Sequence, residues 1–417
     1  MTEEPHREDT TDEPSRPPGA KGTNRERSAI GDFDPTAAEF RANPHPTFAR
    51  LRREAPVARC ERWGGFFALT RYEDIVRAST DPTTFSSAEG VVIPKNPVSG
   101  RRPPLHYDPP EHTVYRQALN VAFTKRRAAA LEPAVRAIAS QLLEPVLEAG
   151  RADMVAAFSS PLATLAFLAM LNVSPEQGRA LQEHSERFEA AQIAEDAATA
   201  EAESQLLTRY CRQFVEERLA EGADPEHDVV AALARARPDG RPVDVETITG
   251  SVRQMIIAAH IAPTCALASA LIHLCGDPAL QTRLRAEPAR TADAVEELLR
   301  LYTPNQGFAR TVRRPVTVSG VDLHPGDQVA IVLTSANRDD AVFERPDDLV
   351  LGRRQHHLAF GHGPHSCIGQ HLARLELRVG VEELLARTRT VELDGEPEWM
   401  SWPVYGPRRL PMRVVPR

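Results

Sequence analysis

The residues most able to do chemistry lie in one short loop near the carboxyl end of the 417-residue chain, Phe360 to Gly369. This loop holds a single cysteine, Cys367, and three glycines, Gly361, Gly363 and Gly369. Because glycine has no Cβ and readily adopts positive φ, the main chain can pass close to a flat group beside the sulfur. The spacing therefore predicts a loop that presents one thiolate to a planar ligand.

The segment after this loop predicts an amphipathic helix that begins just beyond Cys367. Leu372, Leu375 and Val379 recur at helical spacing, with charged residues between them. The backbone N–H groups and the positive end of such a helix stabilise a nearby thiolate. We therefore expect the start of the helix to favour the ionised form of Cys367.

A structural zinc site is the alternative interpretation of the loop, because His362, His365, Cys367 and His371 could all bind zinc. Structural zinc sites normally use paired cysteines, and the loop has only one. The other cysteines show no Cys-x-x-Cys spacing, and we expect them to pack as small apolar side chains in a reducing cytoplasm. They are Cys60, Cys211, Cys265 and Cys275.

The loop pattern Phe-Gly-x-Gly-x-His-x-Cys-x-Gly resembles the cysteine-ligand loop of the cytochrome P450 family. The resemblance implies haem b with Cys367 as the axial ligand of its iron, and a thiolate ligand favours cleavage of the O–O bond. It also implies a mainly helical fold with a small β region, in which the haem lies between a long central helix and the cysteine loop. Landmarks of the family follow in order from Asp32 to the carboxyl end.

The run from Asp108 to Arg116 resembles the family's propionate-binding helix. Asp108 is expected to cap this helix, with two prolines in its first turn. His112 and Arg116 are four residues apart, so they share one helix face. A solvated charged face is the alternative for the helix taken alone. The resemblance implies that His112, Arg116, Arg310 and His365 hold the haem propionates.

A second charged cluster is expected to support the cysteine loop. Glu297 and Arg300 are adjacent on one face of a predicted helix. The resemblance implies a buried pair that a third arginine completes, and Arg353 is the candidate. Such a network would be structural, because charge-assisted hydrogen bonds can satisfy all three groups.

The stretch from Gln254 to Gly276 contains no charged residue and is long enough to span a bilayer. Polar residues interrupt it, and the rest of the chain is hydrophilic, so we expect a buried core helix and no membrane partner.

This helix departs from the family's pattern where it should cross above the haem. The family usually places an acid and then an alcohol there, to deliver protons to the oxygen site, whereas this chain has Ile261 and Ala262. Ala258, Ala259 and Ala262 are expected to line the oxygen side.

Two other residues of the same run also bear on proton delivery. His260 lies about 200° around the helix from Ala258, so we expect a core histidine rather than a proton relay. Pro263 is expected to kink the helix and to free a carbonyl that could hold a water.

The composition limits the remaining possibilities. The formal net charge of −8 and a pI near 6.0 argue against a nucleic-acid partner. Residues 1–30 are polar and are expected to form a disordered tail without a signal peptide, and residues 31–417 to form one domain. We expect a cytoplasmic protein.

The sequence predicts an external electron supply, because the chain lacks a Gly-x-Gly-x-x-Gly fingerprint and a cysteine cluster. The resemblance implies electrons from NAD(P)H through a ferredoxin reductase and a ferredoxin. A locally basic surface could steer an acidic ferredoxin, although a solvated loop is an equal alternative. Its residues are Arg353, Arg354, His356, His357 and Arg374.

The resemblance implies an oxidative tailoring step on a small natural-product-like molecule: hydroxylation, epoxidation or oxidative coupling. The missing acid and alcohol leave two alternatives open. The first is radical C–C or C–N coupling or cyclisation without oxygen insertion. The second is a non-catalytic haem sensor or ligand-binding protein. The pocket candidates by family position are Val92, Asn305, Phe308 and Tyr405. The substrate itself is not readable from the sequence.

Overall fold

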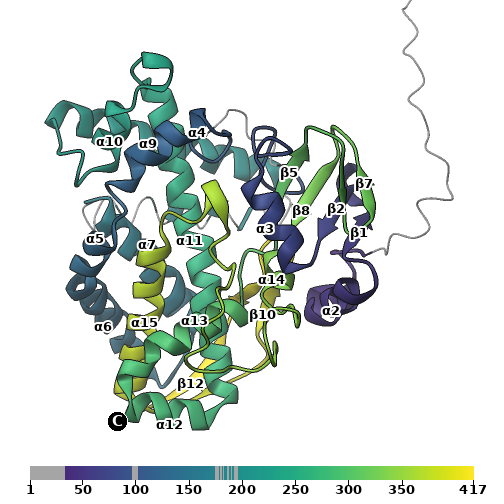
Figure 1. Ribbon diagram of the computed structural model, residues 1–417. Coiled ribbons are helices and arrows are strands. Elements are labelled where there is room, and N and C mark those ends of the chain that lie inside the picture. The colour runs from purple at the N-terminus through teal and green to yellow at the C-terminus, as the bar shows by residue number, and fades with distance from the viewer. Residues whose placement is uncertain are drawn as a thin grey trace, which may run out of the picture.

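The computed structural model describes residues 33–95, 102–173 and 196–417, together with residues 178, 181, 183–185, 187, 188, 190 and 191. Within these residues helices dominate, and the largest sheet lies to one side of them (Figure 1). The mainly helical fold with a small β region is therefore confirmed. The tail predicted for residues 1–30 lies outside the described residues.

The largest sheet has five strands in the order β1-β2-β8-β5-β3. Only β2 and β8 pair in parallel; the other neighbours are antiparallel. The strands are β1 (Val57–Cys60), β2 (Phe66–Leu69), β3 (Phe85–Ser86), β5 (Phe308–Val312) and β8 (Gln328–Ile331). Strand β5 carries Arg310, one of the residues expected to contact the propionates.

Three smaller sheets complete the β structure. Their strands are β4 (Arg151–Asp153), β12 (Pro411–Pro416) and β9 (Thr388–Leu393) in one sheet, β10 (Glu398–Met400) and β11 (Gly406–Arg409) in a second, and β6 (Val316–Val318) and β7 (Val321–Leu323) in a third.

The long helix α11 (Val245–Gly276) runs through the centre of the helical part (Figure 1). The other α-helices are α1 (Ala38–Ala42), α2 (His45–Glu54), α3 (Tyr72–Thr80), α4 (Glu111–Asn120), α5 (Lys125–Ala130), α6 (Glu132–Ala149), α7 (Ser160–Met170), α9 (Ala197–Glu221), α10 (Val229–Arg235), α12 (Pro278–Ala286), α13 (Thr291–Leu301), α14 (Leu333–Ala336) and α15 (Gln370–Arg387).

Helix α11 is long and apolar enough to cross a membrane by length and composition alone. More than half of its most apolar stretch is buried, and it packs against α7, α9, α13 and α15. At its start the Asp244 carboxylate accepts a hydrogen bond from the Thr247 backbone, which satisfies one of the free N–H groups. These contacts are those of a core helix, as expected.

Two glycines let neighbouring elements approach the second half of α11. A Cβ on Gly406 of β11 would overlap the Cys265 side chain and lie 3.0 Å from its Cα. A Cβ on Gly380 of α15 would lie 3.1 Å from Leu267. The absent side chains therefore set how closely β11 and α15 pack against the central helix.

We predict that Gly406→Ala destabilises the protein by about 1–3 kcal/mol, because the new methyl group overpacks the contact with Cys265. Gly276→Ala is the matched control, because nothing lies within 4 Å of its Cβ position. Its effect should stay within about 0.5 kcal/mol. Urea unfolding of both variants measures the difference, and equal midpoints would contradict the predicted close contact.

Candidate functional site

The backbone of the cysteine loop is held by its own turns. The Cys367 N–H donates to the Phe360 carbonyl at 2.7 Å, and the Gly361 N–H donates to Leu358 at 2.8 Å. Gly361 and Gly363 adopt φ of 69° and 70°, in the left-handed region. A Cβ on Gly363 would overlap the Ser79 carbonyl oxygen of α3. The two glycines are therefore required by backbone geometry.

Cys367 is half-buried and lies just before α15. Burial raises the pKa of its thiol, whereas a hydrogen bond from the Gly369 backbone and the charges of Arg116 and Arg374 lower it. The start of the helix favours the thiolate as expected, but burial outweighs it in the protein alone. A bound metal cation would remove the thiol proton.

A cluster of two arginines and two histidines lies beside the loop. The Arg116 guanidinium donates to the Ser366 carbonyl at 2.6 Å, and the ring centroids of His112 and His365 are 4.4 Å apart. Arg310 is 5% exposed and donates to the carbonyl of its neighbour Ala309. The structure thus brings together four residues from α4, β5 and the cysteine loop.

This cluster has no carboxylate ion-pair partner among the residues that the structure describes. Nε2 of His112 and Nε2 of His365 are buried without a hydrogen bond. Burial lowers the pKa of His112 to about 4, of His365 to about 3 and of Arg310 to about 10, and neighbouring positive charges lower the two histidine values further. An incoming pair of carboxylates would satisfy both the free N–H groups and the charge.

The expected capping by Asp108 is wrong. Helix α4 begins at Glu111 with Pro110 as its N-cap, and no side chain caps it. The Asp108 carboxylate instead accepts hydrogen bonds from Ser86 at 2.5 Å and Ser87 at 2.9 Å. It therefore ties strand β3 to the start of α4.

The face of α11 that carries the expected oxygen-side residues is not fully packed by other side chains. Ala258 is exposed although it lies in the middle of a core helix, and Ala259 and Ala262 are half-buried. His260 is buried and hydrogen-bonds through Nδ1 to Thr164 of α7 at 2.6 Å. The expectation that His260 is a core histidine is confirmed.

The residues present fit a haem. The cofactor requires an axial ligand, propionate contacts and room on the oxygen side. The structure offers a sulfur ligand, two arginines and two histidines without a carboxylate ion pair among the described residues, and an alanine face on α11 that is not fully packed. The zinc alternative is wrong, because no three His, Cys, Asp or Glu side chains of the described part of the chain come together as a metal site.

The structure also brings Glu297, Arg300 and Arg353 together. Arg300 Nε lies 2.7 Å from Glu297 Oε1, and Arg353 Nε lies 3.0 Å from Oε2. Hydrogen bonds from these arginines and from the Val350 N–H lower the Glu297 pKa, although burial opposes them. The carboxylate is therefore ionised and fully satisfied.

This network reaches the cysteine loop through Asn337. Arg300 Nη1 donates to the Asn337 backbone carbonyl at 2.9 Å, and the Asn337 side-chain oxygen accepts from the Leu358 N–H at 2.6 Å. Leu358 in turn accepts from Gly361 in the loop. The ionic network thus fixes the segment that leads into the loop.

The predicted basic surface is smaller than expected. Arg353 is occupied by Glu297, and Arg374 and His357 both pair with Glu296, at 2.6 and 3.1 Å. Two of the five predicted residues, Arg354 and His356, are exposed. Glu296, which sequence reasoning missed, neutralises most of the remaining charge.

Three of the four pocket candidates cluster around one strand. The Ala309 N–H donates to the Val91 carbonyl at 2.8 Å, so half-buried Val92 lies beside Phe308 at the start of β5. Asn305 is half-buried and forms a bridge with Val404.

Tyr405, the fourth candidate, makes structural contacts. Its hydroxyl donates to the Ala42 carbonyl at 3.0 Å, and its ring stacks on Trp399 with 4.8 Å between centroids. Both polar and apolar parts of the side chain are occupied, so we do not keep Tyr405 among the pocket residues.

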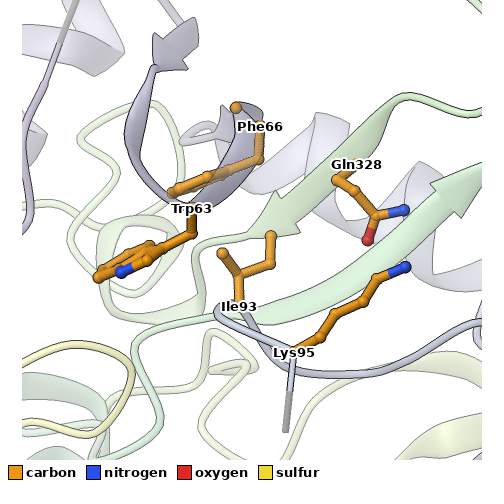
Figure 2. Close-up of a pocket in the computed structure, with 6 residues that line it drawn as sticks. Trp63, Phe66, Ile93, Lys95 and Gln328 are labelled. Carbon is orange, nitrogen blue, oxygen red and sulfur yellow. The ribbon is translucent and has the colours of Figure 1, made fainter. Parts of the chain in front are cut away.

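A separate hollow lies at the large sheet, between Trp63, Phe66, Ile93, Lys95 and Gln328 (Figure 2). Its volume is about 150 Å³, which is below the size of ordinary ligand sites. No residue of the cysteine loop or of α11 lines it. It is therefore distinct from the candidate site.

Arg102 ends the loop from Phe85 that family position places among the pocket candidates, and it hydrogen-bonds at 2.7 Å to Gln254, which sequence reasoning missed. Sequence reasoning also missed Glu376 of α15, which is buried, leaves Oε2 without a partner and has a pKa raised by burial well above its usual value. A carboxyl in the uncharged form at Glu376 avoids repulsion with a thiolate at Cys367. The only sign of Glu376 in the sequence was an acidic residue within a predicted amphipathic helix.

Comparisons with known proteins agree with this geometry. The family profile described as cytochrome P450 matches residues 188–403. Nocardicin C N-oxygenase of Nocardia uniformis is 34% identical over 88% of this chain and 93% of its own length. Cyclomarin C epoxidase of Salinispora arenicola is 30% identical over 88% of this chain and 94% of its own. The structure of a cytochrome P450 from Chondromyces apiculatus superposes with a TM-score of 0.83 at 31% identity, covering 93% of this chain and 99% of that one.

We predict that Glu297→Gln lowers the free energy of unfolding by about 3–5 kcal/mol, because it leaves two buried arginines without their counter-charge. Glu287→Gln is the control, since Glu287 pairs with Arg283 and Arg290 at the surface and should cost less than about 1 kcal/mol. Urea unfolding of both variants tests the difference. Losses of similar size would show that the buried network does not support the fold.

Proposed function

The chain belongs to the cytochrome P450 family, and on this basis we propose that it catalyses an oxidative tailoring step on a small natural-product-like molecule. The step would be a hydroxylation, an epoxidation or an oxidative coupling. The observation that carries the proposal is the group of two arginines and two histidines beside Cys367, whose charges and unpaired histidine nitrogens fit the two carboxylates of a haem. Relatives described as an N-oxygenase and an epoxidase of complex metabolites support the substrate class.

In this proposal Cys367 supplies the axial sulfur, and His112, Arg116, Arg310 and His365 hold the propionates. A bound haem supplies the activation of dioxygen. Arg116 also holds the Ser366 carbonyl, so it couples propionate binding to the position of the cysteine loop. Glu297, Arg300 and Arg353 keep that loop in place from behind.

On the oxygen side, the side chains of Ile261 and Ala262 can neither donate nor relay a proton. Pro263 has no N–H, so the Ala259 carbonyl loses its donor within α11. That carbonyl can accept a hydrogen bond from a water beside the open alanine face. We propose that this water, or a polar group of the substrate, delivers protons in place of the acid and alcohol.

Electrons would come from NAD(P)H through a ferredoxin reductase and a ferredoxin. The proposed docking face is the surface over the cysteine loop, where Arg354 and His356 are exposed. We further propose that residues 31–417 form one domain and that the protein works in the cytoplasm.

A second candidate function is radical C–C or C–N coupling or cyclisation without oxygen insertion. The absence of an acid and an alcohol at Ile261 and Ala262 motivates it. Like oxygen insertion, this reaction would still draw protons for O–O cleavage from water or from the substrate. A non-catalytic haem sensor is the third alternative. Product analysis with ferredoxin, reductase, NAD(P)H, labelled dioxygen and candidate substrates separates the three, since only oxygen insertion places the label in the product.

We predict that the reduced protein with carbon monoxide shows the spectrum of thiolate-ligated haem, and that Cys367→Ala abolishes it. The matched control is Cys275→Ala, a half-buried cysteine in the last turn of α11. Its spectrum should equal that of the wild type. A histidine-type spectrum in the wild type, or an unchanged spectrum in Cys367→Ala, would refute the assignment of the ligand.

We predict that Ala262→Thr lowers the amount of oxygen consumed per molecule of product, because it restores a hydroxyl donor on the oxygen side. Ala234→Thr, a half-buried alanine of α10, is the control for the same change elsewhere. Oxygen-electrode traces with product quantification provide the measurement. An unchanged ratio in Ala262→Thr would mean that protons do not pass this position.

A further inference from the structure

Arg102 reaches from the loop before α4 along the open face of α11. Its Cγ lies 4.0 Å from the position of a Cβ on Gly250, and its Nη1 donates to Gln254 Oε1 at 2.7 Å. Gly250, Gln254 and Ala258 succeed one another at intervals of four residues, so they lie on one side of the helix. The guanidinium therefore points along α11 towards the exposed Ala258.

The charge of Arg102 has no counter-charge in the described part of the chain. The side chain is half-buried, and burial lowers its pKa. The one neighbouring charge that acts on it is another arginine, Arg253, which lowers the pKa further. A partly buried cation that faces a second cation is unfavourable unless an anion joins it.

Arg253 does not relieve this excess of positive charge. It projects from α11 about 100° around the helix from Gln254, where it is 4% exposed and donates to the Ser204 hydroxyl at 2.8 Å. Its guanidinium lies 5.5 Å from the centre of the Phe188 ring, and its Nε is buried without a partner. The charge of Glu201 acts on Arg253, whereas no acidic group of the described residues acts on Arg102.

The hydrogen-bonding edge of Arg102 is free for a ligand. Nη1 is engaged by Gln254, and the Nε and Nη2 groups form no hydrogen bond with a described residue. The backbone is held as well, since the Arg102 N–H donates to His106 Nδ1 at 3.3 Å and its carbonyl accepts from the His106 N–H at 3.0 Å. Two parallel N–H groups on a fixed support match the two oxygens of a carboxylate.

We propose that Arg102 binds a carboxylate of the substrate, with Gln254 as the residue that positions the guanidinium. This inference rests on the proposed oxidative function and names the substrate class: monoanionic carboxylic acids, because one guanidinium balances one negative charge. Gln254 precedes Ala258 by one turn, which is about 6 Å along the helix axis. The oxidised atom therefore lies several bonds away from the carboxylate.

Calorimetric binding to the haem-loaded enzyme tests the proposal with three acids and their primary amides: dodecanoic acid, 4-phenylbutanoic acid and N-acetylphenylalanine. At least one acid should bind the wild type about tenfold or more tightly than its amide. Arg102→Gln should remove this preference, and Arg102→Lys should retain part of it. Arg389→Gln, an exposed arginine on β9, is the control that should change nothing.

The stability of the ligand-free protein separates binding from a structural function of Arg102. Because the guanidinium lacks a counter-charge, Arg102→Gln should leave the urea midpoint unchanged or raise it. A clear fall of the midpoint would show that Arg102 supports the fold, and would overturn the proposal. Equal binding of all acids and amides by the wild type, or a preference that survives in Arg102→Gln, would also overturn it.

The spectrum of the reduced carbon monoxide complex is recorded on the same samples. A thiolate spectrum without any preference for acids contradicts the inference about Arg102 and leaves the oxidative function standing. Loss of the thiolate spectrum in the wild type contradicts the oxidative function itself. The two failures are thus distinguishable.

Discussion

The rest of this structure depends on a set of two arginines and two histidines beside Cys367 that lacks a carboxylate ion pair within the described part of the chain. His112, Arg116, Arg310 and His365 converge from three elements beside Cys367, and no carboxylate among the described residues pairs with them. Holding such groups away from water is unfavourable unless an anion or a set of hydrogen bonds compensates. The fold tolerates the cluster because its polar atoms are arranged for carboxylates that the polypeptide does not provide.

The other side of the cysteine loop shows the opposite arrangement. There Glu297 is held by Arg300, Arg353 and the Val350 N–H, so every charge has its partner within the chain. A buried ionic group is stable under these conditions, and removal of one partner is costly. The loop therefore lies between a network that is complete by itself and a cluster that a ligand completes. This asymmetry gives the loop a rigid support and leaves its ligand side open.

The features predictable from the sequence are those whose signal is local. The glycines around Cys367, the spacing of Glu297 and Arg300, and the apolar run of α11 each act within one element, and the structure has them where the sequence indicated. The pairing of Glu296 with His357 and Arg374, the use of Asp108 by Ser86 and Ser87, and the contact of Tyr405 with Ala42 were not predictable. Each joins segments that the chain brings together only on folding, so propensity and spacing carry no information about them.

Helix α11 has one side whose polar groups are paired within the chain and another side that is left open for a ligand. One side carries His260, whose Nδ1 is hydrogen-bonded to Thr164 in the core. The other carries Gly250, Gln254 and Ala258, which are small or amide side chains and leave space. A helix that must pass through a core needs its polar groups satisfied on the packed side, whereas on the open side small residues leave the contacts to the ligand. Ala262 is also a small residue on the open side, and it stands where the family usually has an alcohol. Its methyl group offers no hydrogen bond, so the bound molecule must supply the hydrogen-bonding group there.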